Sequence, residues 1–151
     1  MSTLKDSLTA DMRAALKARD ELTTSTLRMA LAAIGTAEVA GKAKRELSDE
    51  EVLAVLTRES KKRREAATAF ADAGRTEQAA KELAEGEVLD RYLPKQLGDA
   101  ELADVVSGAL AAGGFEGKTQ MGPAMKAAQA AVAGRAEGGR VAAEVRRQLG
   151  V

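Results

Sequence analysis

Apolar residues recur every three or four positions along most of the chain, which is the spacing of one face of an α-helix. Leu4, Leu8 and Met12 begin this pattern, and Leu27, Leu31 and Ile34 continue it. Sustained alternation of β-branched or aromatic residues, which strands would need, is absent. The pattern therefore predicts an all-α protein.

Capping residues and glycines divide the pattern into helices. The clearest start is Ser48 with Glu51 three residues later, a capping box in which each side chain bonds to a backbone amide of the other. Glycine tolerates the left-handed conformation found at helix ends, so Gly41 and Gly74 mark stops. The N-terminal part is predicted to hold four helices, from Ser2 or Thr3 to Arg19, from Asp20 to Gly41, from Ser48 to Ala73, and over about residues 76–92.

A proline separates this part from a second one. Pro94 disfavours helix at Leu93 before it. We therefore expect an N-terminal helical domain over residues 1–93 with long antiparallel helices, and a C-terminal domain over residues 94–151. The second domain is predicted to hold three helices, the first capped by Asp99 and running to Ala112, the second from Thr119 to Ala133, and the third from Gly138 to Leu149.

The composition removes most catalytic chemistry. The chain has neither His nor Cys, so imidazole acid–base groups, His-containing triads, thiolate nucleophiles and His or Cys metal ligands are excluded. No Walker A phosphate loop occurs. We therefore expect no self-contained catalytic site, no cofactor and no metal. The absence of an apolar segment at the N-terminus and of any run of about 18 apolar residues predicts a cytoplasmic protein without a membrane partner.

The predicted fourth helix carries a cluster of carboxylates. Charged helix faces normally face water, so the cluster is interpreted as a solvated face. Glu82 and Glu85 are one turn apart and are positioned to share a cation weakly. The members are Glu77, Glu82, Glu85, Glu87 and Asp90.

The 23 cations and 23 anions of the chain balance, so any affinity for nucleic acid requires a local patch. The first candidate lies around the predicted third helix and centres on the run Lys61, Lys62, Arg63 and Arg64, with Lys42, Lys44, Arg45 and Arg58 before it. Pairs four residues apart with neighbouring glutamates offset part of its charge. Two interpretations stay open, a salt-bridged solvated helix and a patch that faces phosphates. The lack of interleaved aromatic residues favours contact with a backbone over base stacking.

The second candidate lies in the tail, where residues 116–151 carry three more cations than anions. The amides at the helix start after Gly138 and Gly139 point outward and are able to bind an anion. The alternative for the arginines near the end of this helix is compensation of the helix dipole. The candidate phosphate contacts are Lys118, Lys126, Arg135, Arg140, Arg146 and Arg147.

An ordered set of segments resembles the GatB/YqeY family over nearly the whole chain. The most specific are the junction YLPKQL and the tail pieces Met-Gly and Gly-Arg-Ala. The set comprises residues 27–34 (LRMALAAI), 47–53 (LSDEEVL), 61–66 (KKRREA), 70–75 (FADAGR) and 92–97 (YLPKQL), Met121-Gly122, Met125 and residues 134–136 (GRA).

The resemblance implies a C-terminal domain similar to the tail of the B subunit of the tRNA-dependent amidotransferase, in which the tail contacts tRNA. The catalytic domain of that enzyme has no counterpart here. Members are often labelled carbon–nitrogen ligases with glutamine as amido-N-donor through the similarity of the tail.

We therefore predict a non-catalytic accessory protein that binds tRNA or another structured RNA. One alternative is an accessory subunit in glutamine-dependent amide transfer. Another is a protein–protein interaction module, in which Phe115, Met121 and Met125 form a groove or a self-association face rather than part of the tail core. The sequence leaves the oligomeric state open.

Overall fold

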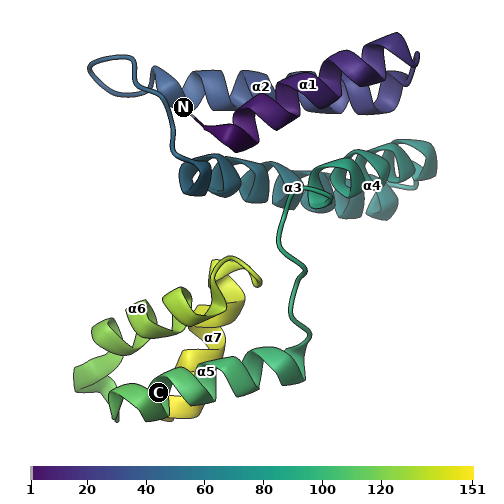
Figure 1. The fold of residues 1–151 in the computed structure, drawn as a ribbon. Helices are drawn as coiled ribbons and strands as arrows, with labels where there is room; N and C mark the ends of the chain where they lie inside the picture. Colours follow the sequence, from purple (N-terminus) through teal and green to yellow (C-terminus); the bar gives the residue numbers. More distant parts are fainter. Residues whose placement is uncertain (1) are drawn as a thin grey trace. The chain divides into compact units, whose positions relative to one another are not determined.

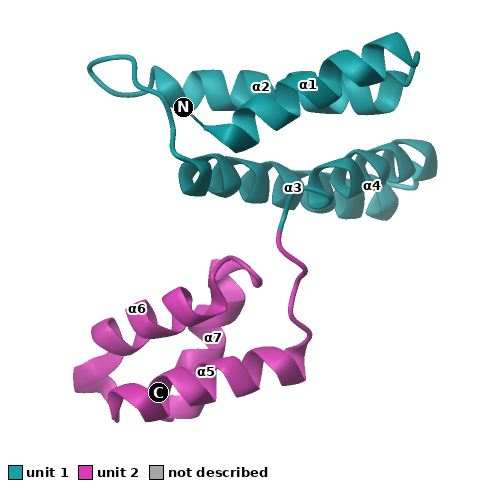
Figure 2. Cartoon of the chain, in the orientation of Figure 1, with its two compact units in different colours: residues 1–93 teal, residues 94–151 magenta. Residues whose placement is uncertain are grey.

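The computed structural model describes residues 2–151. Within that range the prediction of an all-α protein is confirmed, because the elements are seven α-helices and one short 3-10 helix with no strand (Figure 1). None of the described helices is both long and apolar enough to span a bilayer. The chain divides into two compact units, residues 1–93 and residues 94–151 (Figure 2).

Unit 1 consists of two helical hairpins. The first contains α1 (Thr3–Lys17) and α2 (Glu21–Glu38), and the second contains α3 (Asp49–Asp72) and α4 (Thr76–Asp90). Helix α3 packs along α4, and α2 contacts α1, α3 and α4. The turn between α3 and α4 contains Gly74 at a φ of 76°, a conformation that favours glycine.

The apolar side chains of the four helices meet in one core. Leu8, Leu27, Ile34, Val52 and Leu56 are fully enclosed within it. Burial of large aliphatic side chains contributes roughly 1.5–3 kcal/mol each before the entropy of folding is subtracted. The core therefore holds the four helices of unit 1 as a single body.

Helix starts follow the predicted caps. The Ser2 and Asp20 side chains accept bonds from the amides of Lys5 and Thr23, and the capping box of Ser48 and Glu51 forms as expected. The end of α2 differs, since the helix stops at Glu38 and not at Gly41. The Glu38 carbonyl accepts from the amide of Arg45 at 3.0 Å rather than from an amide four residues later, so the helical hydrogen bonds end there.

Unit 2 is a three-helix arrangement with its own core. Its elements are α5 (Asp99–Gly113), the 3-10 helix η1 (Lys118–Gln120), α6 (Met121–Val132) and α7 (Gly138–Leu149). Val106, Val141 and Val145 are fully buried, and the partly buried Phe115, Met121 and Met125 pack against this core. The three residues considered for a groove thus contribute to the core of unit 2.

Two predicted starts in unit 2 are shifted. Asp99 is the first residue of α5 and does not cap it, because Gly98 is the cap and the Glu101 carboxylate accepts from the Gly98 amide. The 3-10 helix η1 covers the first residues that were predicted for α6. Helix α6 therefore begins at Met121 rather than Thr119.

Candidate nucleic-acid interface

Helix α3 presents a row of cations on the side opposite its buried residues. Val55, Leu56, Ser60 and Ala67 are buried, which fixes the rotation of the helix. Side chains that project away from this buried face lie in solvent, as the 3.6-residue period requires. We call the exposed cations the α3 basic row, which comprises Arg58, Lys61, Lys62 and Arg64.

Carboxylates offset only part of the charge of the α3 basic row. The Lys62 Nζ atom lies 3.3 Å from a Glu59 oxygen, and the Lys61 Nζ atom lies 3.9 Å from a Glu65 oxygen. Such exposed pairs stabilise a helix by a few tenths of a kcal/mol and break easily. Arg64 donates to the neutral Ser60 hydroxyl at 3.0 Å, and Arg58 makes no ion pair within residues 2–151. The row therefore keeps a net positive charge.

Arg63 does not belong to this exposed row, although the sequence run includes it. Its side chain is 17% exposed, and its Nη1 atom lies 3.4 Å from Glu82 and 3.3 Å from Glu85 on α4. Phosphate contact through Arg63 would require breaking these ion pairs. The guanidinium instead connects α3 to α4.

The same ion pairs correct the interpretation of the α4 carboxylates as a solvated face. Glu85 is buried, the side chain of Glu82 is 18% exposed, and Asp90 accepts a hydrogen bond of 2.6 Å from the buried Ser60 hydroxyl. The cation that Glu82 and Glu85 share is Arg63. Glu77, Glu87 and Asp90 are exposed as expected, and Asp90 combines this exposure with its bond from Ser60.

In unit 2, Arg135 and Arg140 direct their donors to the backbone of the same unit. Arg135 donates from Nε to the Val132 carbonyl and from Nη2 to the Ala131 carbonyl, both at 2.9 Å. These bonds satisfy carbonyls at the end of α6, and the positive charge suits that end of the helix dipole. Arg140 donates to the Leu97 carbonyl at 3.1 Å and to Asp99 at 3.0 Å.

Backbone and side-chain contacts join two segments of unit 2 that are distant in the sequence. The Leu97 amide of the YLPKQL segment donates to the Arg135 carbonyl of the Gly-Arg-Ala segment at 2.7 Å. Gln96 also donates to the Gly134 carbonyl at 3.3 Å. The two motifs therefore form one structural clasp, in which Arg140 holds the other side of Leu97.

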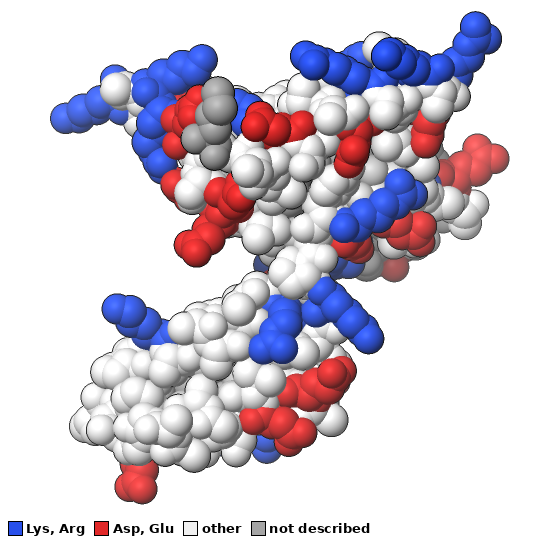
Figure 3. All heavy atoms as spheres, in the orientation of Figure 1, with Lys and Arg blue, Asp and Glu red and all other residues white. Residues whose placement is uncertain are grey.

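Three of the remaining tail cations have no ion pair within the described range. Lys118, Lys126 and Arg146 are exposed on η1, α6 and α7. Arg147 pairs with Glu144, which raises the pKa of the guanidinium and lowers the pKa of the carboxyl. The face of unit 2 drawn in Figure 3 is largely uncharged, with its basic side chains toward the margins.

The start of α7, proposed from the sequence as an anion site, already has a carboxylate beside it. Glu137 is the N-cap residue, and its Oε1 atom lies close to Gly139. Repulsion between this carboxylate and a phosphate weakens the case for anion binding there. Among residues 2–151, no group of three or more His, Cys, Asp or Glu residues is placed to hold a metal ion.

The family model for Yqey-like proteins matches residues 5–149. The chain belongs to the Yqey-like protein family. The match to this family spans both compact units, so the clasp of unit 2 and the α3 basic row of unit 1 lie within the family region. No curated protein matches the chain.

The sequence contained a signal for the position of Arg63 that the run of four cations obscured. Leu56, Ser60, Arg63 and Ala67 follow one another at steps of three or four residues, which is the spacing of one helix face. The role of Arg140 has no comparable local signal, because its partners at residues 97 and 99 are about forty positions away. The side chain of Arg135 bonds to carbonyls only three and four positions away, at the end of α6.

Proposed function

We propose that the chain is a non-catalytic RNA-binding protein of the cytoplasm that contacts the phosphate backbone through the α3 basic row. The observation that supports this proposal is the placement of four exposed cations within two turns of one helix, of which Lys62 pairs with Glu59 and Lys61 with Glu65. From Arg58 to Arg64 the helix rises ~9 Å. That length corresponds to two or three phosphates of one strand of a duplex.

Two of the three aromatic residues of the chain are engaged within the protein, which favours backbone contact over base stacking. The Tyr92 hydroxyl donates to Asp11 at 2.6 Å, and Phe115 packs on the core of unit 2. Base stacking on a protein needs an exposed aromatic face. We therefore infer binding that depends on the shape and charge of RNA more than on its base sequence.

The tRNA part of the proposal comes from the resemblance of unit 2 to the amidotransferase tail. The exposed Lys118, Lys126 and Arg146 are the tail cations that we assign to a secondary contact. Arg135 and Arg140 are assigned to the clasp instead.

Binding of a tRNA transcript, measured on filters at one salt concentration, tests the proposal. We expect K61Q/R64Q to raise the Kd about tenfold or more, because two phosphate contacts and the counterions that they release are lost. R13Q/K17Q is the matched control, since it removes two exposed cations from α1 in the same unit. Equal affinities of K61Q/R64Q and the wild type would contradict the proposal.

A second RNA tests preference for structure. We expect an unstructured RNA of the same length to bind more weakly than the tRNA transcript. Equal binding of both RNAs would remove tRNA as the preferred ligand and leave general phosphate binding.

A further inference from the structure

A groove of about 610 Å³ lies between α2 and α3, beside the α3 basic row. We propose that this groove binds an acidic amphipathic helix of a protein partner. The groove shares Arg58 and Lys62 with the α3 basic row, whereas its apolar floor plays no part in the proposed RNA contact. The lining residues are Ala33, Thr36, Ala37, Ala40, Val55, Arg58, Glu59 and Lys62.

The floor of the groove is apolar and made of small side chains. Ala33, Ala37, Ala40 and Val55 supply methyl groups, with no long side chain from α2 to keep a partner away. The axes of packed helices lie 8–10 Å apart, and small side chains at the contact allow the shorter distances. An incoming helix is thus able to approach α2 and α3 closely and cover this floor.

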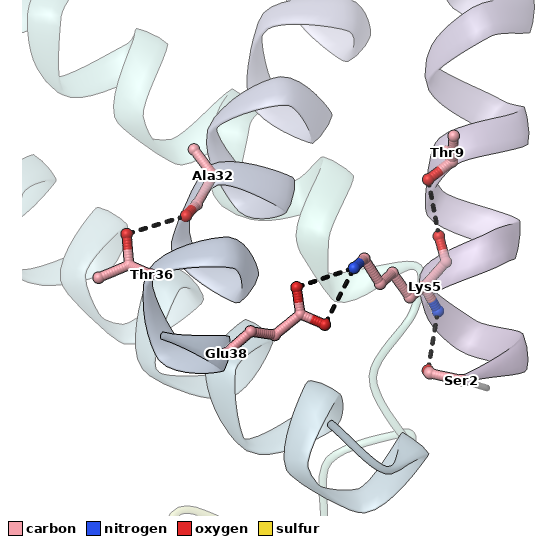
Figure 4. Close-up of polar contacts among 6 residues, drawn as sticks. All are labelled: Ser2, Lys5, Thr9, Ala32, Thr36 and Glu38. Atoms are coloured by element: carbon pink, nitrogen blue, oxygen red, sulfur yellow. Dashed lines mark hydrogen bonds and ion pairs between the residues drawn. The ribbon is translucent and has the colours of Figure 1, made fainter. Parts of the chain in front are cut away.

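The wall formed by α2 carries no charge. Thr36 projects from α2 on the side away from Glu38 and Lys5 (Figure 4), and its hydroxyl donates to the Ala32 carbonyl at 3.1 Å. The buried Glu38 carboxylate is turned toward α1, where Lys5 Nζ donates to its two oxygens at 2.9 and 3.0 Å. The nearest carboxylate of α2 is therefore neutralised and does not face the groove.

The wall formed by α3 is cationic. Arg58 and Lys62 are four residues apart, so they lie on the same side of α3 one turn from each other. Glu59 is 16% exposed and pairs with Lys62, whereas Arg58 has no ion pair in the described chain. Basic side chains also gather over the loop between α2 and α3 (Figure 3), which contains Lys42 and Lys44. This charge distribution complements a helix with carboxylates four residues apart.

The floor favours a protein over RNA as the occupant. Burying phosphates and ribose hydroxyls against methyl groups removes their water without giving hydrogen bonds in return. Apolar side chains of a helix gain free energy from the same burial. An amphipathic helix satisfies both the floor and the cationic wall.

Two synthetic peptides of 18 residues, each held helical by a side-chain staple, test the proposal on the full chain. Both carry Ala and Leu on one face, and one carries flanking Glu residues four positions apart where the other carries Lys. We expect the Glu peptide to bind at least tenfold more tightly than the Lys peptide in fluorescence anisotropy. R58E/K62E should reverse this preference, and R58Q/K62Q should abolish it.

Thr36→Trp places a large uncharged side chain in the groove at an exposed position and leaves the net charge unchanged. We expect it to weaken both peptides while circular dichroism shows an unchanged helix content. Three results would overturn the proposal: no binding of either peptide to the wild type, a preference that R58E/K62E leaves unchanged, or a loss of affinity for the tRNA transcript in Thr36→Trp. The last result would place RNA in the groove.

Discussion

Arg63 and Arg64 are neighbours in the sequence with different environments. The guanidinium of Arg63 lies between two carboxylates of α4 that are largely or fully buried, whereas Arg64 is exposed beside a serine hydroxyl. Removing one partner of a buried ion pair leaves a charge without water or a counterion, which costs more than the pair contributed. The two arginines therefore differ in what their replacement does.

We predict that R63M destabilises unit 1 by about 3 kcal/mol, because Glu85 is left buried and unpaired. Urea unfolding followed by circular dichroism measures the loss. R64M is the matched control and should change stability by less than about 0.5 kcal/mol, as exposed substitutions usually do. A smaller loss in R63M/E85M than in R63M would confirm the cause, and equal stability of R63M and R64M would contradict it.

Arg140 acts on the backbone of its own unit. We predict that R140Q destabilises unit 2 by about 1.5 kcal/mol, because the partly buried hydrogen bond to the Leu97 carbonyl involves a charged donor, whereas the pair with the fully exposed Asp99 adds little. Amide hydrogen exchange of residues 95–99 should accelerate in this variant. K126Q is the control, since Lys126 is exposed and has no ion pair in the described range. Unchanged exchange in R140Q would show that the Arg140 bonds do not hold residues 95–99 in place.

At the scale of elements, the starts of α1 and α3 are joined by one carboxylate. Asp49 accepts hydrogen bonds from the Ser2 hydroxyl at 2.5 Å, the Thr3 hydroxyl at 2.6 Å and the Leu4 amide at 3.1 Å. These bonds lower the pKa of Asp49 from 3.8 to about 2, and bonds from Arg45 and the Ser48 amide lower the pKa of Glu51 from 4.5 to about 2. Both carboxylates therefore stabilise the fold only while they are ionised.

The sign of the pH dependence follows from these lowered pKa values. A carboxyl whose pKa is lower in the folded state contributes stability that is full above its unfolded pKa and is lost as the pH falls. We predict that the Tm of the wild type decreases as the pH falls from about 4.5 to 2. D49N should have a lower Tm at pH 7 and a smaller decrease in this interval, and parallel Tm curves of the two proteins would contradict the assignment.

The sequence predicted helix starts better than helix ends. Ser2, Asp20 and Ser48 cap the helices that follow them through bonds to amides three residues away, so the whole interaction is visible in a short segment. The end of α2 depends on a bond from Arg45 seven residues later. Asp99 resembled a cap but pairs with Arg140, a contact that local pattern does not contain.

In the candidate site too, the sequence predicted what depends on local spacing and missed what depends on distant partners. The rotation of α3 is encoded in its apolar spacing, which separates exposed Lys61 and Arg64 from the buried side that contains Arg63. The partners of Arg63 lie on a second helix, α4. Arg135 bonds to carbonyls at the end of α6, and Arg140 bonds to the distant segment that contains Leu97. Charge alone therefore identified candidate contacts without separating surface cations from structural ones.

For the whole molecule, the equal numbers of cations and anions make the distribution of charge decisive. A chain without net charge attracts a polyanion only at a surface patch where cations outnumber the neighbouring carboxylates. The α3 basic row is such a patch in unit 1, whereas two of the arginines of unit 2 are engaged in its clasp. We therefore propose that most of the affinity for RNA comes from unit 1.

The salt dependence of RNA binding tests this central claim most directly. Log affinity plotted against log salt concentration for a tRNA transcript has a slope of about 0.7–0.9 per phosphate contact. We predict that K61Q/R64Q lowers the magnitude of the wild-type slope by about 1.4–1.8, the value for two contacts, and that R13Q/K17Q leaves it unchanged. A slope for K61Q/R64Q equal to that of the wild type would contradict the account.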